Sequence, residues 1–321
     1  MSSSTRIVFM GTPEFAVSSL NALVEHGFHV VGVITSPDKA AGRGQRIHES
    51  AVKKYALEHD LPLLQPTNLK DPDFQERLAA LKADIQIVVA FRMLPESVWN
   101  MPPKGTVNLH ASLLPNYRGA APINWAVMNG DTATGLTTFF IEKEIDTGKV
   151  IFQEKMAIPY NWTAGQLHDE LMVMGGALLV KTVKAIESGF DNAIDQKQML
   201  DIIDPLPAPK IFKEHCKINW QQPTTSIYNH IRGLSPYPAA WCELVSPEGD
   251  IHQIKLFKCE EDAHVSSGTA GAIKTDGKKL WTVACADGDI RIEELQLAGK
   301  KRMHVGDFLR GFNLTDQWKL Q

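Results

Sequence analysis

The N-terminal half of the chain alternates short apolar runs with amphipathic segments. Residues 6–10 and 29–35 are apolar enough to form buried strands, and the segment between them carries apolar positions at helical spacing. Thr12 stands before Pro13, which suits the first helical position, so we expect Thr12 to be the N-cap of this helix. A strand, a helix and a second strand in this order predict an α/β domain whose mostly parallel sheet is covered by helices.

The same alternation continues as far as residue 188. We expect helices at 50–59, 71–82 and 163–188, and strands at 61–65, 84–90 and 149–158. The run at 84–90 is the apolar central strand, and the loop 91–95 follows its C-terminal end, where open α/β sheets bind ligands. No G-x-G-x-x-G series follows Gly11, so a nicotinamide-dependent enzyme is not expected.

The C-terminal part of the chain has a shorter repeat. Apolar-rich runs separated by turn residues lie at 241–245, 253–259, 268–274, 280–284 and 290–297. This spacing predicts a small β-barrel. The prolines at 205, 207 and 209 fit a stiff linker. We therefore divide the chain into a domain at 1–204, a linker at 205–210 and a domain at 211–321.

Polar side chains at the end of an apolar run are the first candidates for chemistry. Polar and apolar positions alternate over 107–110, which predicts a strand end with Asn108 and His110 on one face, about 7 Å apart. The amide can donate to an oxygen that becomes negative, and the imidazole can do the same or move a proton, according to its charge. Asp146 follows the apolar run 136–141, so we expect it where that strand ends, beside the first, orienting the imidazole or relaying a proton.

An isolated Asn-x-His pair is more often structural than catalytic, so the surrounding sequence has to decide. Residues 108–122 read Asn-Leu-His-Ala-Ser-Leu-Leu-Pro-Asn-Tyr-Arg-Gly-Ala-Ala-Pro, and Asp-Thr-Gly follows at 146–148. This series closely resembles the formyltransferases that use 10-formyltetrahydrofolate. The resemblance implies a Rossmann-like, mostly parallel formyltransferase domain followed by a small OB-like β-barrel domain. It also implies that the catalytic residues are Asn108, His110 and Asp146, and that folate contacts Ser112, Leu113, Leu114 and Pro115.

Basic residues gather in the polar loop at 36–50, where Gly42 and Gly44 flank Arg43. A charged loop by itself is typically solvated and disordered. Together with residues 11–15, this loop resembles the one that family members acting on tRNA insert at the acceptor end, and 297–303 resembles the end of their barrel domain. We expect contacts to tRNA phosphates from these regions, with a solvated surface as the alternative. The residues concerned are Lys39, Arg43 and Arg46 of the loop, Lys300 and Lys301 of the barrel domain, and in addition Lys210 of the linker.

The sequence does not assign a single role to two arginines near the expected site, Arg92 and Arg118. Arg92 lies in the loop 91–95, where the family more often has a glycine-containing loop that is one residue longer and helps to wall the pterin pocket. Arg118 can contact an anionic group of a substrate or form a structural ion pair.

Composition limits the kinds of binding partner and the cellular compartment that we expect. The net charge is −4 and the pI is near 6.3, so any binding of nucleic acid must come from local basic patches. The four cysteines form no C-x-x-C pair, which favours reduced, buried thiols. No apolar run reaches membrane-spanning length. We expect a cytoplasmic monomer that has no membrane association and needs no metal.

The resemblance implies transfer of the formyl group of 10-formyltetrahydrofolate to the α-amino group of methionyl-initiator tRNA, for translation initiation. One alternative is a formyltransferase acting on a sugar-nucleotide amine or on glycinamide ribotide, which would use the same catalytic residues. The loop at 36–50 and the barrel favour tRNA over these small amines. A second alternative is a non-catalytic RNA-binding protein on an α/β scaffold, against which the intact Asn108, His110 and Asp146 argue.

Overall fold

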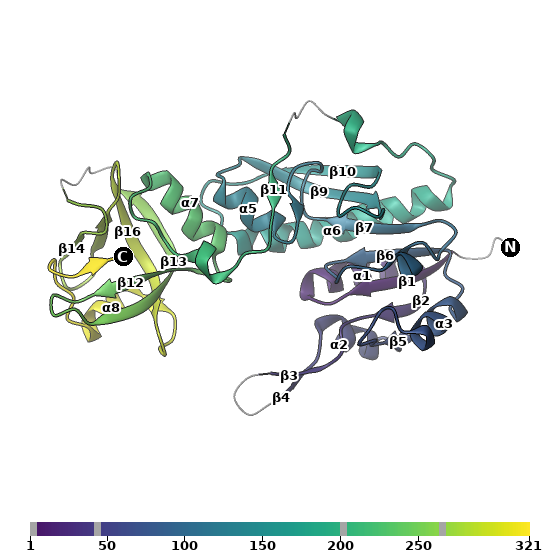
Figure 1. The fold of residues 1–321 in the computed structure, drawn as a ribbon, viewed down its shortest axis with the longest axis horizontal. Helices are drawn as coiled ribbons and strands as arrows, with labels where there is room; N and C mark the ends of the chain where they lie inside the picture. Colours follow the sequence, from purple (N-terminus) through teal and green to yellow (C-terminus); the bar gives the residue numbers. More distant parts are fainter. Residues whose placement is uncertain (1–4, 42–45, 200–203, 263–267) are drawn as a thin grey trace. The chain divides into compact units, whose positions relative to one another are not determined.

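The computed structural model describes residues 5–41, 46–199, 204–262 and 268–321 (Figure 1). By its internal contacts the chain divides into two compact units. The first consists of Met1–Gly119, Thr134–Met156 and His168–Pro207, and the second of Ala120–Ala133, Ala157–Leu167 and Ala208–Gln321. Two segments from the middle of the sequence therefore belong to the unit that holds the C-terminal third. The domain boundaries at 204 and 210 stay a prediction.

The first unit is built on a seven-stranded sheet with the strand order β10-β9-β7-β6-β1-β2-β5. Its strands are β1 (Arg6–Gly11), β2 (His29–Ile34), β5 (Leu63–Leu64), β6 (Ile85–Val89), β7 (Thr106–His110), β9 (Ala133–Phe140) and β10 (Val150–Ala157). Neighbouring strands from β5 to β7 are parallel, whereas β9 runs antiparallel to β7. The predicted mostly parallel sheet is confirmed.

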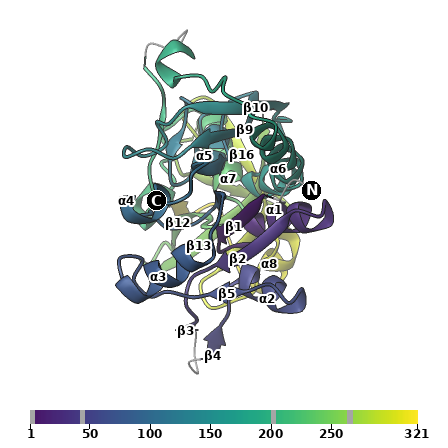
Figure 2. The same ribbon diagram turned by 90° about the vertical axis from the view of Figure 1, so that its right-hand side faces the viewer.

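Helices and short strands complete this part of the fold. The helices are α1 (Glu14–Glu25), α2 (Ala51–Glu58), α3 (Pro72–Ala80), α4 (Glu96–Trp99), α6 (Ala164–Glu187) and the 3₁₀ turn η1 (Gln196–Met199). The short strands are β3 (Lys39–Ala41), β4 (Arg46–His48), β8 (Arg118–Gly119) and β11 (Pro207–Ala208). The β3 and β4 strands pair with each other and project away from the large sheet (Figures 1 and 2).

The start of α1 differs from the prediction by one residue. The N-cap is Pro13, not Thr12, and no side chain caps this end. Pro13 has ψ 178°, an extended backbone, so helical geometry begins only at Glu14. In α2, by contrast, Ser50 is a capped start, because its hydroxyl accepts a hydrogen bond from the Lys53 backbone N at 3.0 Å.

Different helices cover the two faces of the sheet, and this decides where the polar residues of β7 point. On one face Leu109 meets α6 closely, since a Cβ built on Gly175 would lie 2.8 Å from Leu109 Cδ2. On the other face Val88 packs with buried residues of α3 and α4. Asn108 is paired with Val88 in the parallel register, so Asn108 and His110 lie on the face away from α6.

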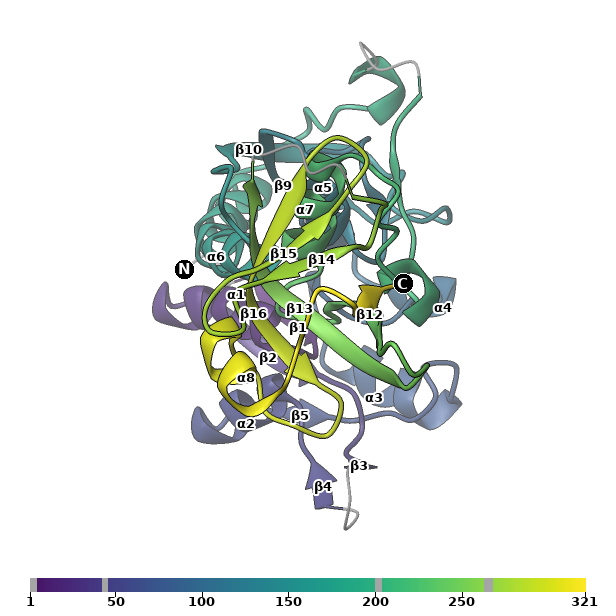
Figure 3. The same ribbon diagram turned by 90° about the vertical axis from the view of Figure 1, so that its left-hand side faces the viewer.

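The second unit contains an antiparallel sheet that is almost closed into a barrel (Figure 3). Its strands are β12 (Ala240–Val245), β13 (Ile251–Asp262), β14 (Ile273–Thr275), β15 (Trp281–Ala284), β16 (Asp289–Leu297), β17 (Met303–His304) and β18 (Lys319–Leu320). The order is β14-β15-β16-β13-β12-β18, and a bridge between Ala272 and Lys319 joins the two edges. The predicted barrel is confirmed, although the strand expected at 268–274 is limited to β14.

Helices of the second unit come from distant parts of the sequence. They are α5 (Pro122–Met128), η2 (Lys213–Cys216), α7 (Thr224–Leu234) and α8 (Val305–Gly311). Helices α5 and α7 approach closely at Gly233, where a Cβ would lie 2.8 Å from the Met128 backbone N. Asn124 also donates a hydrogen bond to the Gly233 carbonyl at 2.8 Å. These contacts explain why the segment that holds α5 groups with the barrel.

The four cysteine side chains are free thiols, and all are buried. Burial raises the pKa of the Cys285 thiol to about 12, and it also raises the pKa values of the other three, which are Cys216, Cys242 and Cys259. In the part of the chain that the structure describes, no helix is long and apolar enough to cross a membrane.

We expect the folded protein to react only slowly with a thiol-specific reagent such as dithionitrobenzoate. The thiolate is the reactive form, and a raised pKa keeps these thiols protonated at pH 8, where an exposed cysteine is already partly ionised. After unfolding in guanidinium chloride, each molecule should react with four equivalents of the reagent, because the sequence holds four cysteines. A rapid stoichiometric reaction of the folded protein would contradict this reading of the thiols.

Candidate active site

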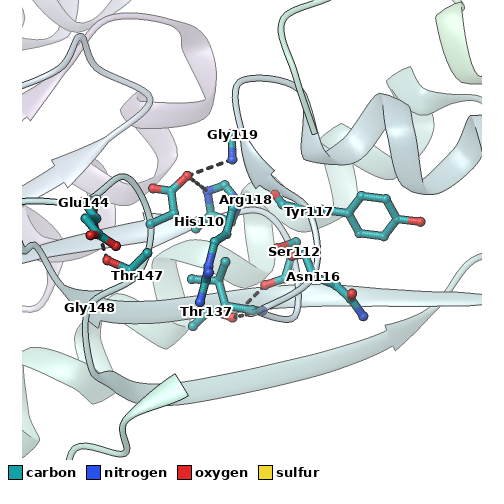
Figure 4. Close-up of polar contacts among 12 residues, drawn as sticks. His110, Ser112, Asn116, Tyr117, Arg118, Gly119, Thr137, Glu144, Thr147 and Gly148 are labelled. Carbon is teal, nitrogen blue, oxygen red and sulfur yellow. Dashed lines mark hydrogen bonds and ion pairs between the residues drawn. The ribbon is translucent and has the colours of Figure 1, made fainter. Parts of the chain in front are cut away.

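His110 ends β7 and is held by a backbone carbonyl (Figure 4). Its Nε2 lies 2.8 Å from the Tyr117 carbonyl oxygen, and the side chain is 8% exposed. A carbonyl only accepts hydrogen bonds, so Nε2 must carry a proton and donate it here. The other ring nitrogen, Nδ1, lies 3.8 Å from Asp146 Oδ2, which is too far for a direct hydrogen bond. Nδ1 is therefore the ring nitrogen that can take part in proton transfer.

Asp146 is fixed from both its side chain and its backbone. Its Oδ2 accepts a hydrogen bond from the Gly119 backbone N at 2.9 Å (Figure 4). Its φ of +55° lies in the left-handed region, which costs a non-glycine residue on the order of 1 kcal/mol. Two residues later, a Cβ on Gly148 would lie 1.7 Å from the Phe140 carbonyl oxygen. Only glycine fits this position, and this explains why a glycine ends the Asp-Thr-Gly sequence.

The expected position of Asp146 at the end of its strand needs a correction. The strand β9 ends at Phe140, which pairs with Val107, whereas His110 pairs with Thr137. Because β9 is antiparallel to β7, its last residue lies roughly 10 Å along the sheet from His110, three residues at about 3.3 Å each. The loop 141–149 brings Asp146 back to the imidazole. The side chains meet as expected, but through a loop rather than through adjacent strand ends.

The Asn108 amide lies on the same sheet face as His110, two residues earlier on β7. Its side chain is partly buried. Among residues 5–41, 46–199, 204–262 and 268–321, no group forms a hydrogen bond with this amide. An amide that no described group satisfies, on the same sheet face as an imidazole, is free to donate to a bound substrate.

The segment Ser112–Pro115 is held rigidly beside this group of residues. The Thr137 hydroxyl donates to the Ser112 carbonyl at 2.7 Å and accepts from the Leu114 backbone N at 3.1 Å. Gln153 donates to the Leu114 carbonyl at 2.8 Å. The side chains of Ser112, Leu114 and Pro115 are buried in the protein, so Leu113 is the member whose side chain is partly exposed.

Arg92 points to a neighbouring turn. Its guanidinium donates to the Thr67 carbonyl at 3.0 Å and to the Pro66 carbonyl, and burial lowers its pKa. The loop that follows β6 therefore keeps its arginine engaged with the protein. Met93 in the same loop is 73% exposed and presents an apolar surface at the C-terminal end of β6.

Among the described residues Arg118 pairs with an amide rather than with a carboxylate, so the structural ion pair is not formed, and a contact with an anionic substrate group stays a prediction. Its Nε and Nη2 donate to the Gln196 Oε1 atom at 3.1 and 2.6 Å. Gln196 was not found from the sequence, because a single glutamine in a polar stretch gives no signal. Thr137 could have been found, since it is a polar residue within the otherwise apolar run at 136–141.

The basic residues expected to contact tRNA belong to both units. Lys39 is exposed on β3, Arg46 begins β4, and Arg43 lies outside the described residues. Lys210 places its Nζ 5.5 Å from the centre of the Phe212 ring. The remaining two, Lys300 and Lys301, are exposed. Within the described segments no three His, Cys, Asp or Glu side chains gather as a metal site.

Comparison with known proteins identifies the family. A formyl transferase family model matches residues 5–183, and the model of the formyl transferase C-terminal domain matches residues 210–313. A methionyl-tRNA formyltransferase from Bacteroides fragilis is 57% identical over 316 residues, which are 98% of this chain and 98% of that protein.

Solved structures show a related fold. HypX from Aquifex aeolicus, in complex with tetrahydrofolic acid, matches with a TM-score of 0.62 and 18% identity over 96% of this chain and 48% of HypX. WlaRD, a sugar 3N-formyl transferase in the presence of dTDP and 5-N-formyl-THF, matches with a TM-score of 0.65 and 20% identity over 94% of this chain and 100% of that one. With both family models and a full-length relative in agreement, the chain belongs to the formyltransferase family, among the methionyl-tRNA formyltransferases.

Proposed function

We propose that this chain transfers the formyl group of 10-formyltetrahydrofolate to the α-amino group of methionyl-initiator tRNA, giving formylmethionyl-tRNA for translation initiation. The observation that carries the proposal is the 57% identity to the Bacteroides fragilis enzyme over 98% of both chains. That similarity includes the barrel as well as the sheet that holds the site. The likeness to WlaRD, a sugar N-formyl transferase, is at 20% identity and concerns the fold alone.

The residues around β6 and β7 fit a folate. A folate carries a flat, partly apolar ring system with polar edges, and it needs apolar surface next to unsatisfied polar groups. Met93 offers exposed apolar surface where β6 ends, and the Asn108 amide is unsatisfied among described residues on the neighbouring strand. We propose that Ser112, Leu113, Leu114 and Pro115 supply further folate contacts, and Leu113 is the member whose side chain is partly exposed. When bound, the folate supplies a formyl group carried on nitrogen.

The chemical step joins the amine of methionine to the formyl carbon. A bond forms between the amine nitrogen and this carbon, and the bond from the carbon to the folate nitrogen breaks. The amine loses one proton and the folate nitrogen gains one, so no oxidant or reductant is needed. The site must therefore stabilise an oxygen that becomes negative and must move one proton.

The three polar residues divide these tasks. Asn108 donates from its amide to the negative oxygen. His110 accepts the amine proton at Nδ1, because Nε2 is engaged by the Tyr117 carbonyl. Once Nδ1 is protonated, the Asp146 carboxylate 3.8 Å away stabilises the imidazolium, and Nδ1 can donate to the oxyanion or return the proton to the leaving nitrogen.

We propose that phosphates of the tRNA contact Lys39, Arg43, Arg46, Lys210, Lys300 and Lys301. Lysine and arginine side chains of this kind supply affinity by neutralising phosphates and releasing counterions. Exposed lysines of this set are present in both units. We further propose that the protein is a cytoplasmic monomer.

The substrate is tested by measuring formyl transfer from 10-formyltetrahydrofolate to four acceptors. These are methionyl-initiator tRNA, uncharged initiator tRNA, glycinamide ribotide and an amino-sugar nucleotide. Product on the charged initiator alone supports the proposal. Product on a small amine, without product on the tRNA, would replace the substrate while leaving the catalytic residues in place.

Replacement of Asn108 or His110 by alanine should lower kcat by about 100- to 1000-fold, because each removes a preorganised group that acts on the developing charge. Thermal unfolding should remain cooperative. His26→Ala serves as the control, since His26 is exposed at the end of α1, and it should retain normal turnover. A folded Asn108→Ala protein with near-normal kcat would remove Asn108 from the mechanism.

Replacement of Lys210 by alanine should weaken use of tRNA without changing the KM for folate. One lost phosphate contact makes the slope of log kcat/KM against log salt shallower by roughly 0.7 to 0.9. Lys274→Ala removes an exposed lysine of β14, which is not among the proposed contacts, and should leave the slope as it is in the original protein. Equal slopes for all three proteins would argue against a phosphate contact at Lys210.

A further inference from the structure

Gln196 is a buried polar residue that lies beyond the last long helix of the first unit. Its exposed fraction is 1%. A bridge from Ile194 to Val150 of β10, with both hydrogen bonds at 2.8 Å, fixes the chain just before it. The Asp195 side chain accepts from the Lys197 backbone N at 2.8 Å, which stabilises the turn η1. The position of Gln196 is thus set by the end of the large sheet.

Both ends of the Gln196 amide are used in hydrogen bonds. The oxygen, Oε1, accepts from Arg118 Nε at 3.1 Å and from Arg118 Nη2 at 2.6 Å. The nitrogen, Nε2, donates to the Asp146 carbonyl at 2.9 Å and to the Gly148 carbonyl at 2.8 Å. One amide therefore joins the segment that precedes α5 to the loop that carries Asp146.

A second link closes this arrangement into a ring. The Gly119 backbone N, next to Arg118, donates to Asp146 Oδ2 at 2.9 Å. Asp146 is therefore held by its own carboxylate on one side and by its own carbonyl on the other. A non-glycine residue with φ of +55° persists only where its surroundings fix it, and Gln196 supplies two of the fixing hydrogen bonds.

We infer that Gln196 is a positioning residue for formyl transfer, which holds the Asp146 carboxylate at its distance from His110 Nδ1. This inference rests on the proposed function and on the catalytic role proposed for Asp146. The competing explanation is that Gln196 only anchors the segment 190–199 to the first unit. In that case its replacement would lower stability without a specific effect on the chemical step.

The Gln196→Glu variant distinguishes the role of the amide oxygen from that of the amide nitrogen. A glutamate keeps an oxygen that accepts from Arg118, but it loses the two donors to the Asp146 and Gly148 carbonyls. We expect kcat to fall by about 10- to 100-fold, which is the scale of losses when a catalytic group is displaced by about 1 Å. The KM values for folate and tRNA should stay unchanged. Gln196→Ala should give a loss at least as large.

Coupling to Asp146 distinguishes positioning from anchoring. Asp146→Asn removes the charge that Gln196 is inferred to place, so adding Gln196→Glu to that variant should cause no further loss of kcat. Losses that multiply in the double variant would overturn the inference, and so would a folded Gln196→Glu protein with normal kcat. Thermal unfolding of each variant shows whether the fold is retained.

Hydrogen exchange of the Gly119 amide provides a readout that needs no activity. This N–H donates to the Asp146 carboxylate, so it should exchange faster in Gln196→Glu than in the original protein, while amides of β1 are unchanged. Unchanged exchange at Gly119 would mean that Gln196 does not hold Asp146. If the original protein fails to formylate methionyl-tRNA while Gly119 responds as expected, the proposed function is wrong but the structural link stands.

Discussion

The antiparallel pairing of β9 with β7 is the constraint on which the site depends. In a wholly parallel sheet the residue after a neighbouring strand would lie beside His110 at once. Here β9 ends at Phe140, beside Val107, and the chain must turn back along the sheet to deliver a carboxylate. The returning loop contains the left-handed Asp146 and the closely packed Gly148, and the buried Gln196 holds it by a hydrogen bond to the Asp146 carbonyl.

His110 shows how a backbone carbonyl can determine the use of a catalytic side chain. The Tyr117 carbonyl accepts from Nε2, so the ring orientation and the tautomer are set by one hydrogen bond. Tyr117 itself has φ of +60°, another left-handed residue in the loop that follows β7. The strain in both loops lies at the site, in keeping with the tendency of functional positions to store backbone strain.

Several features could be predicted from the sequence because they follow from local patterns. Alternation over 107–110 places Asn108 and His110 on one face, and evenly spaced turn residues indicate the barrel. Other features depend on contacts between distant residues, which leave no local pattern. Gln196 reaches Arg118 across 78 positions of sequence, and the loop that returns Asp146 depends on the direction of β9. The Thr12 cap failed for a local reason, because Pro13 is still extended.

The chain passes from one unit to the other at 119/120, 133/134, 156/157, 167/168 and 207/208, and this has a consequence for synthesis on the ribosome. The segment that holds α5 emerges long before α7, its packing partner at Gly233. The residues of α5 that pack on α7 therefore lack these contacts until the barrel sequence has been translated. A protein fragment that ends at the proline-rich stretch would therefore contain two segments, Ala120–Ala133 and Ala157–Leu167, without the barrel residues of their unit.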